Sequence, residues 1–246
     1  MERGVYVALL GIDGGGKSSV AAALREGLEH AGHEVVDAST DVMFERAALG
    51  EGHPWESLHH IAEEGWRLYL RQPPAQSAVF TSGLLELTAY CVIRADVVEP
   101  ALERGAVVLT DSFCLKNVVR TLRQAQFMEG CLREAVDQAL RGVRTALSSP
   151  VLQPDVGLLL DADPALALRW RRAQRGGLEP GADLSVAGRP GDEAFVELQS
   201  ALATELREAA GHWGWHVLSV DGRPLAETVS AALSHVREHP GLRGPR

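Results

Sequence analysis

Lysine is nearly missing from this sequence. Of its 24 basic residues only Lys17 and Lys116 are lysines, and a genome rich in G and C is an ordinary explanation for the arginines elsewhere. The formal net charge is −9. Because binding to nucleic acid needs a broad face of basic residues that releases counterions, this balance argues against a nucleic-acid partner. It leaves room only for a local anion site.

Cysteine is scarce too, and long apolar runs are missing. Cys91, Cys114 and Cys131 have no metal-ligand spacing and cannot all pair, which favours buried thiols in a reducing compartment. No apolar stretch reaches the length of about 20 residues that a membrane span needs. The apolar run 5–10 leads into a glycine loop rather than a signal-peptide cleavage site. We therefore expect a cytoplasmic protein with no membrane partner.

Short apolar segments alternate with longer amphipathic ones along the chain. The apolar segments predict buried strands over 4–10, 33–38, 106–110, 156–160 and 215–220. The segments between them predict helices over 18–31, 54–71, 84–103, 116–147, 164–175, 193–209 and 225–236. This alternation predicts an α/β fold with a five-stranded parallel sheet, helices on both faces, and ligands at the carboxyl ends of the strands.

The length of 246 residues suits one such domain, which we expect to span residues 1–239. The stretch 176–192 is rich in glycine and proline and follows a cluster of arginines, so we predict a mobile lid over about 171–192. Residues 240–246 lack apolar anchors, and we expect them to form a disordered tail.

A glycine-rich loop joins the first predicted strand to the first predicted helix. It reads Gly11-Ile12-Asp13-Gly14-Gly15-Gly16-Lys17-Ser18-Ser19, which fits the spacing of a Walker A motif, or P-loop. In such a loop the backbone N–H groups surround phosphate oxygens. Lys17 would reach the β and γ phosphates, and the Ser18 hydroxyl would ligate Mg²⁺. We therefore predict a P-loop NTPase fold with ATP and Mg²⁺ as cofactors; a chance glycine-rich turn is the alternative.

An acid ends the predicted strand 106–110. Asp111 has the position of a Walker B aspartate, which holds the metal or its water shell. The alternative for Asp111 is a cap at the start of the following helix, and this would not exclude a metal role.

Beyond the P-loop the chain resembles the thymidylate kinase family in several blocks. The P-loop 11–19 carries the family's acid followed by small residues. The block 89–111 looks like its aromatic and arginine helix, its Pro-Ala-Leu turn and the strand before its Asp-Arg-Tyr motif. The block 154–164 looks like the strand before its lid. The resemblance implies an ATP-dependent kinase, a small-molecule phosphoryl acceptor and a possible homodimer.

The resemblance also implies roles for acceptor-binding residues. By analogy Asp13 would meet a sugar hydroxyl, Tyr90 would stack on the base, and Arg94 would bind the phosphate of the acceptor. Tyr90 and Arg94 are four residues apart and so share one face of a helix. Core packing of Tyr90 and a surface ion pair of Arg94 are the alternatives.

Arginines in the lid region complete the catalytic set of Lys17 and Asp111. In family members with a small residue at the position of Gly14, the catalytic arginine is expected from the lid. Such an arginine would bring positive charge to the transferring oxygens as the lid excludes water. The candidates are Arg171, Arg172 and Arg175; a solvated helix end is the alternative for each.

The chain departs from the family on the acceptor side. Ser112 follows Asp111 where the family has an arginine that grips the acceptor phosphate, and the family's Arg-Glu-Pro-Gly and thymine-reading positions are also replaced. Lys116 and Arg120 lie one helical turn apart and could form a substitute anion site beside Ser112. A solvated helix face is the alternative for this pair.

Three functions remain open at this point. The leading one is transfer of the γ-phosphoryl group of ATP to a nucleoside monophosphate or related acceptor. The second is a kinase for a hydroxyl of a nucleoside or specialised metabolite, with Asp111 or Asp13 accepting the proton. The third is a regulator that binds ATP without turnover.

Overall fold

The chain folds around one parallel β-sheet. The structure is a computed structural model that describes residues 3–39, 76–128, 132–175, 191–222 and 224–242. Five strands lie in the order β2-β3-β1-β4-β5, and every neighbouring pair is parallel. The strands are β1 (Tyr6–Gly11), β2 (Val35–Asp37), β3 (Val107–Thr110), β4 (Val156–Ala162) and β5 (His216–Val220). The predicted five-stranded parallel sheet is confirmed.

The central strand determines where the glycine loop lies. All residues of β1 and β3 are buried, because helices cover both faces of a parallel sheet. β1 pairs with β3 on one side and with β4 on the other. The loop that leaves β1 therefore emerges between the carboxyl ends of two neighbouring strands.

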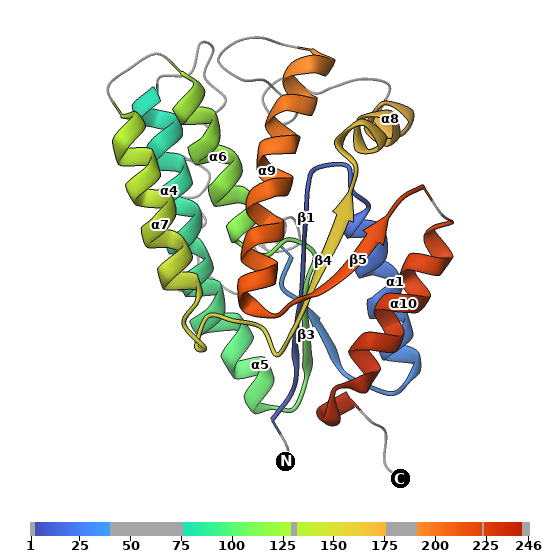
Figure 1. Cartoon of the computed structure of the whole chain (residues 1–246). Coiled ribbons are helices and arrows are strands. Elements are labelled where there is room, and N and C mark those ends of the chain that lie inside the picture. The colour runs from blue at the N-terminus through green and yellow to red at the C-terminus, as the bar shows by residue number, and fades with distance from the viewer. Residues whose placement is uncertain (1–2, 40–75, 129–131, 176–190, 223, 243–246) are drawn as a thin grey trace.

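Helices cover both faces of the sheet (Figure 1). α1 (Lys17–His30) and α10 (Leu225–Glu238) pack together on one face. The other face carries α5 (Glu99–Glu103), α6 (Leu115–Phe127) and α9 (Asp192–Trp213), and α6 is packed in turn against α4 (Gln76–Ile93) and α7 (Arg133–Leu147). α8 (Pro164–Arg175) follows β4 and contacts α9 at the carboxyl end of the sheet.

Several predicted element bounds were wrong. The single helix predicted over 116–147 is two helices, because the extended backbone of Met128 ends α6. The helix predicted over 84–103 begins at Gln76 instead, and a π-helical turn at Arg94–Val98 separates α4 from α5. The helix predicted over 54–71 lies outside the described residues.

The prediction of a disordered tail from residue 240 onward was wrong for its first three residues. Pro240–Leu242 forms a 3-10 turn, and Leu242 is buried. An apolar side chain in the core anchors this turn, so the chain stays packed beyond residue 239. The last four residues lie outside the described part.

Within the described part of the chain, one helical stretch is long and apolar enough to cross a membrane by length and composition alone. It runs through α4, the π-helical turn and α5, over Gln76–Glu103, and 28% of its most apolar window is buried. The sequence predicts that no apolar stretch is long enough to span a membrane, and this helical stretch does not fit that prediction. In the structure α4 packs along α6, and a helix that packs in the core of a protein passes the same test.

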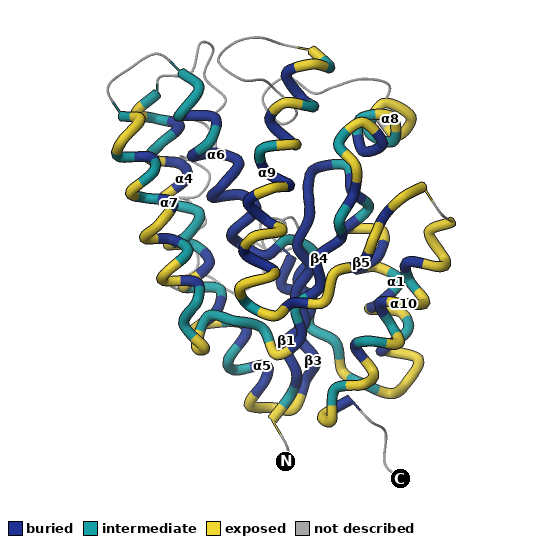
Figure 2. Tube along the Cα trace, in the orientation of Figure 1, coloured by how far each residue is buried: buried dark blue, intermediate teal, exposed yellow. Residues whose placement is uncertain are grey.

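Buried residues concentrate in the strands and in the helix surfaces that face them (Figure 2). Part of this core is aromatic. The ring of Phe113 lies edge-on to Tyr90 at 5.2 Å and to Trp215 at 5.0 Å between centroids. Such pairs add to the stabilisation that burial alone provides.

Gly157 in β4 is required by this aromatic packing. A Cβ atom built on Gly157 would lie 2.1 Å from a ring carbon of Trp215, and Trp215 is fixed by Phe113 and by a hydrogen bond from its Nε1 to Gln153 Oε1 of 2.9 Å. Gly157→Ala should therefore destabilise the fold by about 1–3 kcal/mol, the usual cost of overpacking. Chemical denaturation measures this change.

Gly142 provides the matched control. It lies in α7, and a Cβ atom built on it would meet, apart from its chain neighbours and the nearby backbone of its own helix, no atom of the described residues within 4 Å. Gly142→Ala should therefore stabilise the fold by about 0.4–1 kcal/mol. Equal effects of the two substitutions would contradict the packing assigned to Trp215.

Candidate functional site

The glycine loop has the backbone that a phosphate cradle needs. Gly14 and Gly16 have φ angles of 75° and 86°, a left-handed conformation that side chains disfavour. Gly16 caps the amino end of α1. A Cβ at Gly14 would also lie 2.8 Å from the Ala167 carbonyl oxygen of α8. The positive end of α1 therefore begins at this loop, where it favours a negative charge.

Lys17 is buried at the base of this loop. Its Nζ donates a hydrogen bond of 2.8 Å to the Ile12 carbonyl oxygen. Burial, and next the ammonium of Lys116, lower the pKa of Lys17 from 10.5 to about 8. Because burial is the largest cause of this shift, an anion bound beside the ammonium would raise the pKa of Lys17 again.

Ser18 and Asp111 come together across the loop. Ser18 Oγ donates a hydrogen bond of 2.7 Å to Asp111 Oδ2, so the structure places side by side the two residues predicted as metal ligands. Ser39 Oγ accepts a hydrogen bond of 3.0 Å from the Asp111 backbone N–H. α6 begins later, at Leu115, with no side-chain cap, which disfavours a capping role for Asp111. One hydroxyl and one carboxylate oxygen are hard ligands of the kind Mg²⁺ prefers.

Asp13 is the centre of a buried charge cluster. Lys116 Nζ lies 2.5 Å from Asp13 Oδ1, and Arg120 Nη1 lies 3.4 Å from Asp13 Oδ2. All three residues are at most 8% exposed. Burial alone would raise the pKa of Asp13, but Lys116 and then Arg120 outweigh it and hold that pKa well below its ordinary value. Asp13 is therefore a carboxylate at any physiological pH.

Two helices supply the cations and the remaining partners of this cluster. Lys116 and Arg120 come from α6, and both are buried rather than on the solvated face that was the alternative. Lys116 also donates to Asn117 Oδ1 at 3.1 Å. Glu86 of α4 faces the same cations. Burial raises its pKa, against the fields of Arg120 and Lys116 and a hydrogen bond from Asn117.

Sequence reasoning missed Gln199. It lies on α9, is 1% exposed, and makes two hydrogen bonds to Asp13. Its distance of 186 residues along the chain from Asp13 hid it. Glu86 and Asn117 were missed as well, although Asn117 directly follows the predicted site residue Lys116 in the sequence.

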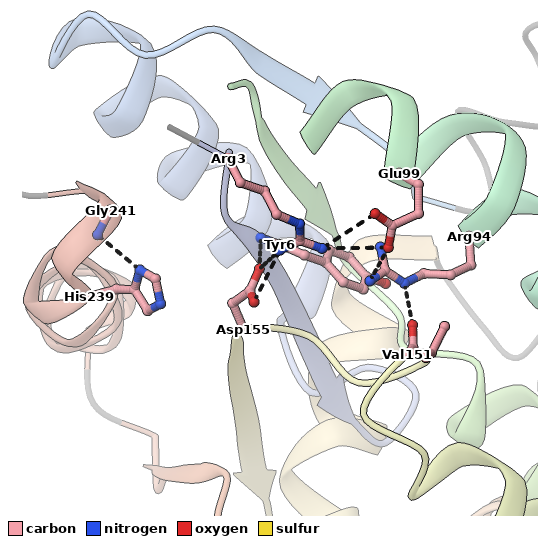
Figure 3. Close-up of polar contacts among 8 residues, drawn as sticks. All are labelled: Arg3, Tyr6, Arg94, Glu99, Val151, Asp155, His239 and Gly241. Carbon is pink, nitrogen blue, oxygen red and sulfur yellow. Dashed lines mark hydrogen bonds and ion pairs between the residues drawn. The ribbon is translucent and has the colours of Figure 1, made fainter. Parts of the chain in front are cut away.

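The structure does not bring Tyr90 and Arg94 to the glycine loop, which corrects their expected roles as acceptor-binding residues. Arg94 Nε donates to the Val151 carbonyl oxygen at 2.8 Å, and Nη2 lies 2.7 Å from Glu99 Oε1. Figure 3 shows this group beside Tyr6 and Asp155, at the amino ends of β1 and β4. The glycine loop lies at the opposite ends of these strands.

Tyr90 is part of the core. Its hydroxyl donates a hydrogen bond of 2.5 Å to the Leu152 carbonyl oxygen, and its ring packs on Phe113. Core packing was the alternative for Tyr90. A surface ion pair was the alternative for Arg94. Arg94 does form an ion pair, with Glu99, but the arginine side chain is buried.

The other predicted residues are the lid arginines, Ser112 and Ser19. Arg172 of α8 forms an ion pair of 2.6 Å with Asp192 at the start of α9. Arg171 is half-buried on α8, and the side chain of Arg175 lies outside the described part. Ser112 Oγ is buried and has no hydrogen-bond partner among the described residues. Ser19 is exposed beside the loop.

A pocket of about 200 Å³ adjoins the loop on the side of α10. Its walls come from the loop, the carboxyl ends of β4 and β5, α8 and the first turn of α10. They include Gly15, Ser19, Trp170, Val220 and Thr228. The lining of this pocket is mostly apolar.

The fold and this loop define a P-loop kinase. A glycine loop between strand and helix carries a lysine, with a hydroxyl and a carboxylate paired beside it, and this is the set of groups that P-loop enzymes use for phosphoryl transfer. Known proteins of this kind align with the chain over nearly their whole lengths.

The comparisons with curated proteins point to one family. The chain is 32% identical over 237 residues to the thymidylate kinase of Clavibacter sepedonicus, covering 93% of this chain and 97% of that one. It is 28% identical over 233 residues to the thymidylate kinase of Ruegeria pomeroyi, covering 95% and 94%. The chain belongs to the thymidylate kinase family, whose members are ATP-dependent phosphotransferases. No protein-family model matches it.

A solved structure supports the fold. A deoxyadenosine kinase from M. mycoides with bound dATP matches with a TM-score of 0.57 at 14% identity, covering 95% of this chain and 99% of that one. At this identity the likeness shows the shared P-loop kinase fold and no more.

The buried pair of Asp13 and Lys116 should be strongly coupled. A double-mutant cycle of Asp13→Asn and Lys116→Met, read by chemical denaturation, should give a coupling energy of about 1–3 kcal/mol, since the charges are desolvated and in contact. The control is the cycle for Arg25 and Asp37, an ion pair of 3.3 Å at the surface, for which we expect less than about 1 kcal/mol. Equal coupling in the two cycles would contradict a buried charge cluster.

Proposed function

We propose that the protein transfers the γ-phosphoryl group of ATP to the phosphate of a nucleoside monophosphate or a closely related acceptor. The observation that carries the proposal is the division of the site. Lys17, Ser18 and Asp111 form a donor side, and Lys116 and Arg120 place two cations on the other side of Asp13. Charge on both sides suits an anionic donor and an anionic acceptor.

The donor side has places for each part of ATP. The triphosphate would lie in the glycine loop against Lys17 and the amino end of α1. The adenine would occupy the 200 Å³ pocket between the loop and α10. Among the described residues no cluster of three His, Cys, Asp or Glu side chains could hold a metal, and Mg²⁺ in such a site relies instead on the substrate's own phosphates.

Ser18 and Asp111 are the residues that would hold Mg²⁺. When bound, this ion neutralises charge on the β and γ phosphates. The chain's own contribution is to position the donor and to exclude water around it.

The transfer needs little chemistry from the protein. An oxygen of the acceptor phosphate attacks the γ phosphorus, the bond from that phosphorus to the bridging oxygen breaks, and its electron pair leaves with ADP. A phosphate acceptor that is already ionised has no proton to lose. Lys116 and Arg120 would hold the acceptor, and a lid arginine, Arg171, Arg172 or Arg175, would add charge during transfer.

A second candidate is a kinase for a hydroxyl of a nucleoside or another small molecule. The observation in its favour is that Lys116 and Arg120 both contact Asp13, which already cancels part of their charge. Ser112 offers no positive charge where the family has an arginine. A hydroxyl acceptor would pass its proton to a carboxylate such as Asp111.

A substrate panel separates these functions. The protein is incubated with ATP, Mg²⁺ and a set of nucleoside monophosphates and nucleosides, dTMP included, and products are identified by mass. We expect a nucleoside diphosphate as product, and we expect Lys17→Ala to lower the rate by about 10²-fold or more. Phosphorylated nucleosides without diphosphates would favour the second candidate. ATP binding without any transfer would favour a regulator.

The affinity for ATP should depend on pH. Because the pKa of Lys17 is about 8 in the free protein and a bound polyphosphate would raise it, binding above that pH must take up a proton. The affinity should therefore be flat below about pH 7.5 and fall by up to about tenfold per pH unit above about pH 8. Calorimetry up to about pH 9.5 measures this dependence.

Lys116→Gln is the matched variant for this measurement. The ammonium of Lys116 helps to lower the pKa of Lys17. Its removal should therefore raise that pKa and move the pH at which the affinity for ATP begins to fall to a higher value. A wild-type affinity that does not change across this range would contradict a depressed pKa of Lys17.

A further inference from the structure

Gln199 connects a distant helix to the acid of the glycine loop. Its Oε1 accepts a hydrogen bond of 3.0 Å from the Asp13 backbone N–H, and its Nε2 donates one of 3.2 Å to Asp13 Oδ2. A side-chain amide has both an acceptor and a donor, so this one residue satisfies the backbone and the side chain of Asp13 together.

The position of Asp13 in turn decides the position of the two cations. With Oδ2 shared between Gln199 and Arg120, Oδ1 is left to Lys116 at 2.5 Å. Three of the roughly four acceptor positions of an ionised carboxylate are thus used by the protein itself. Asp13 is directed toward Lys116 and Arg120 rather than toward open space.

These contacts are too buried to be incidental. Gln199 is 1% exposed, and Asp13 is 8% exposed. A buried polar group left without a partner is costly, and more so when it is charged. Loss of the amide would therefore leave the Asp13 N–H unsatisfied and let the carboxylate move.

We propose that Gln199 is a positioning residue: it fixes the Asp13 carboxylate, which holds Lys116 and Arg120 in place to receive the anionic group of the acceptor. This inference rests on the proposed function for the identity of the acceptor. Gln199 itself does not touch the reacting atoms. Asp13 on this view orders cations, in addition to or in place of the sugar contact that the family resemblance implies.

The lysine content of the chain allows a direct test. The sequence has two lysines, Lys17 and Lys116, so ¹³C-lysine labelling gives two Cε signals, and Lys17→Arg assigns them. Asp13 opposes the effect of burial on the pKa of Lys116. We therefore expect Gln199→Leu, which frees Asp13 to move, to lower the pKa of Lys116 by about half a unit or more.

Gln153→Leu is the matched control. Gln153 also uses its amide twice, as acceptor from Trp215 Nε1 and as donor to the Leu147 carbonyl oxygen, but at the other end of the sheet. It should destabilise the fold without changing either lysine signal. If Gln199→Leu does not fold, Gln199→Glu keeps the shape and adds a negative charge, which should raise the pKa of Lys116 instead.

Kinetics supply the second readout. With an acceptor found in the substrate panel, Gln199→Leu should lower kcat/KM for the acceptor by about tenfold or more and leave the Kd for ATP within about twofold. The double variant of Gln199→Leu with Asp13→Asn should have the same kcat/KM for the acceptor as Asp13→Asn alone, because both substitutions act through the Asp13 carboxylate.

The two proposals fail in different ways. An unchanged Lys116 titration in both Gln199 variants would overturn the positioning role, whatever the activity. Absence of transfer by the wild-type protein to every acceptor would overturn the proposed function, while the lysine titration would still decide the role of Gln199.

Discussion

The contact between the Asp13 carboxylate and the Lys116 ammonium constrains the whole site. Both groups are buried, and buried charges are tolerated only when they are paired and hydrogen-bonded. Asp13 can stay at the end of β1 only because α6 supplies Lys116 and Arg120 and α9 supplies Gln199. Two helices that are distant from this loop in the sequence are thereby held to it.

The sheet order explains why these elements can meet. β1 is central, so the loop after it is the one place that α1, α6 and α9 can all approach from the two faces (Figure 1). The proposed donor side uses the local features of the loop and α1. The proposed acceptor side uses long-range contacts from the opposite face of the sheet. Ser112, which departs from the family pattern expected from the sequence, belongs to this second side.

The fold and the donor side could be predicted from the sequence, because their signals are local. The glycine spacing predicts the loop conformation, and the position of the acid after β3 predicts that it lies at the same edge of the sheet. Because β1 and β3 are parallel neighbours, the residues that follow them meet, as Ser18 and Asp111 do. Lys116 and Arg120 were found because helical spacing puts both on one face.

Other features could not be predicted. The spacing of Tyr90 and Arg94 predicts that they share a helix face, but it does not predict which end of the sheet this face contacts. In the structure both residues lie near the amino ends of the strands. Gln199 has no local motif, since its role exists only after folding brings α9 to the loop.

A crystal structure with a non-hydrolysable ATP analogue, Mg²⁺ and the acceptor tests the central claim most directly. We expect Lys116 Nζ and the Arg120 guanidinium to contact the anionic group of the acceptor while Asp13 keeps its hydrogen bonds to Gln199. An acceptor bound without contact to Lys116 or Arg120, or an Asp13 that has left Gln199, would contradict a site organised around this carboxylate.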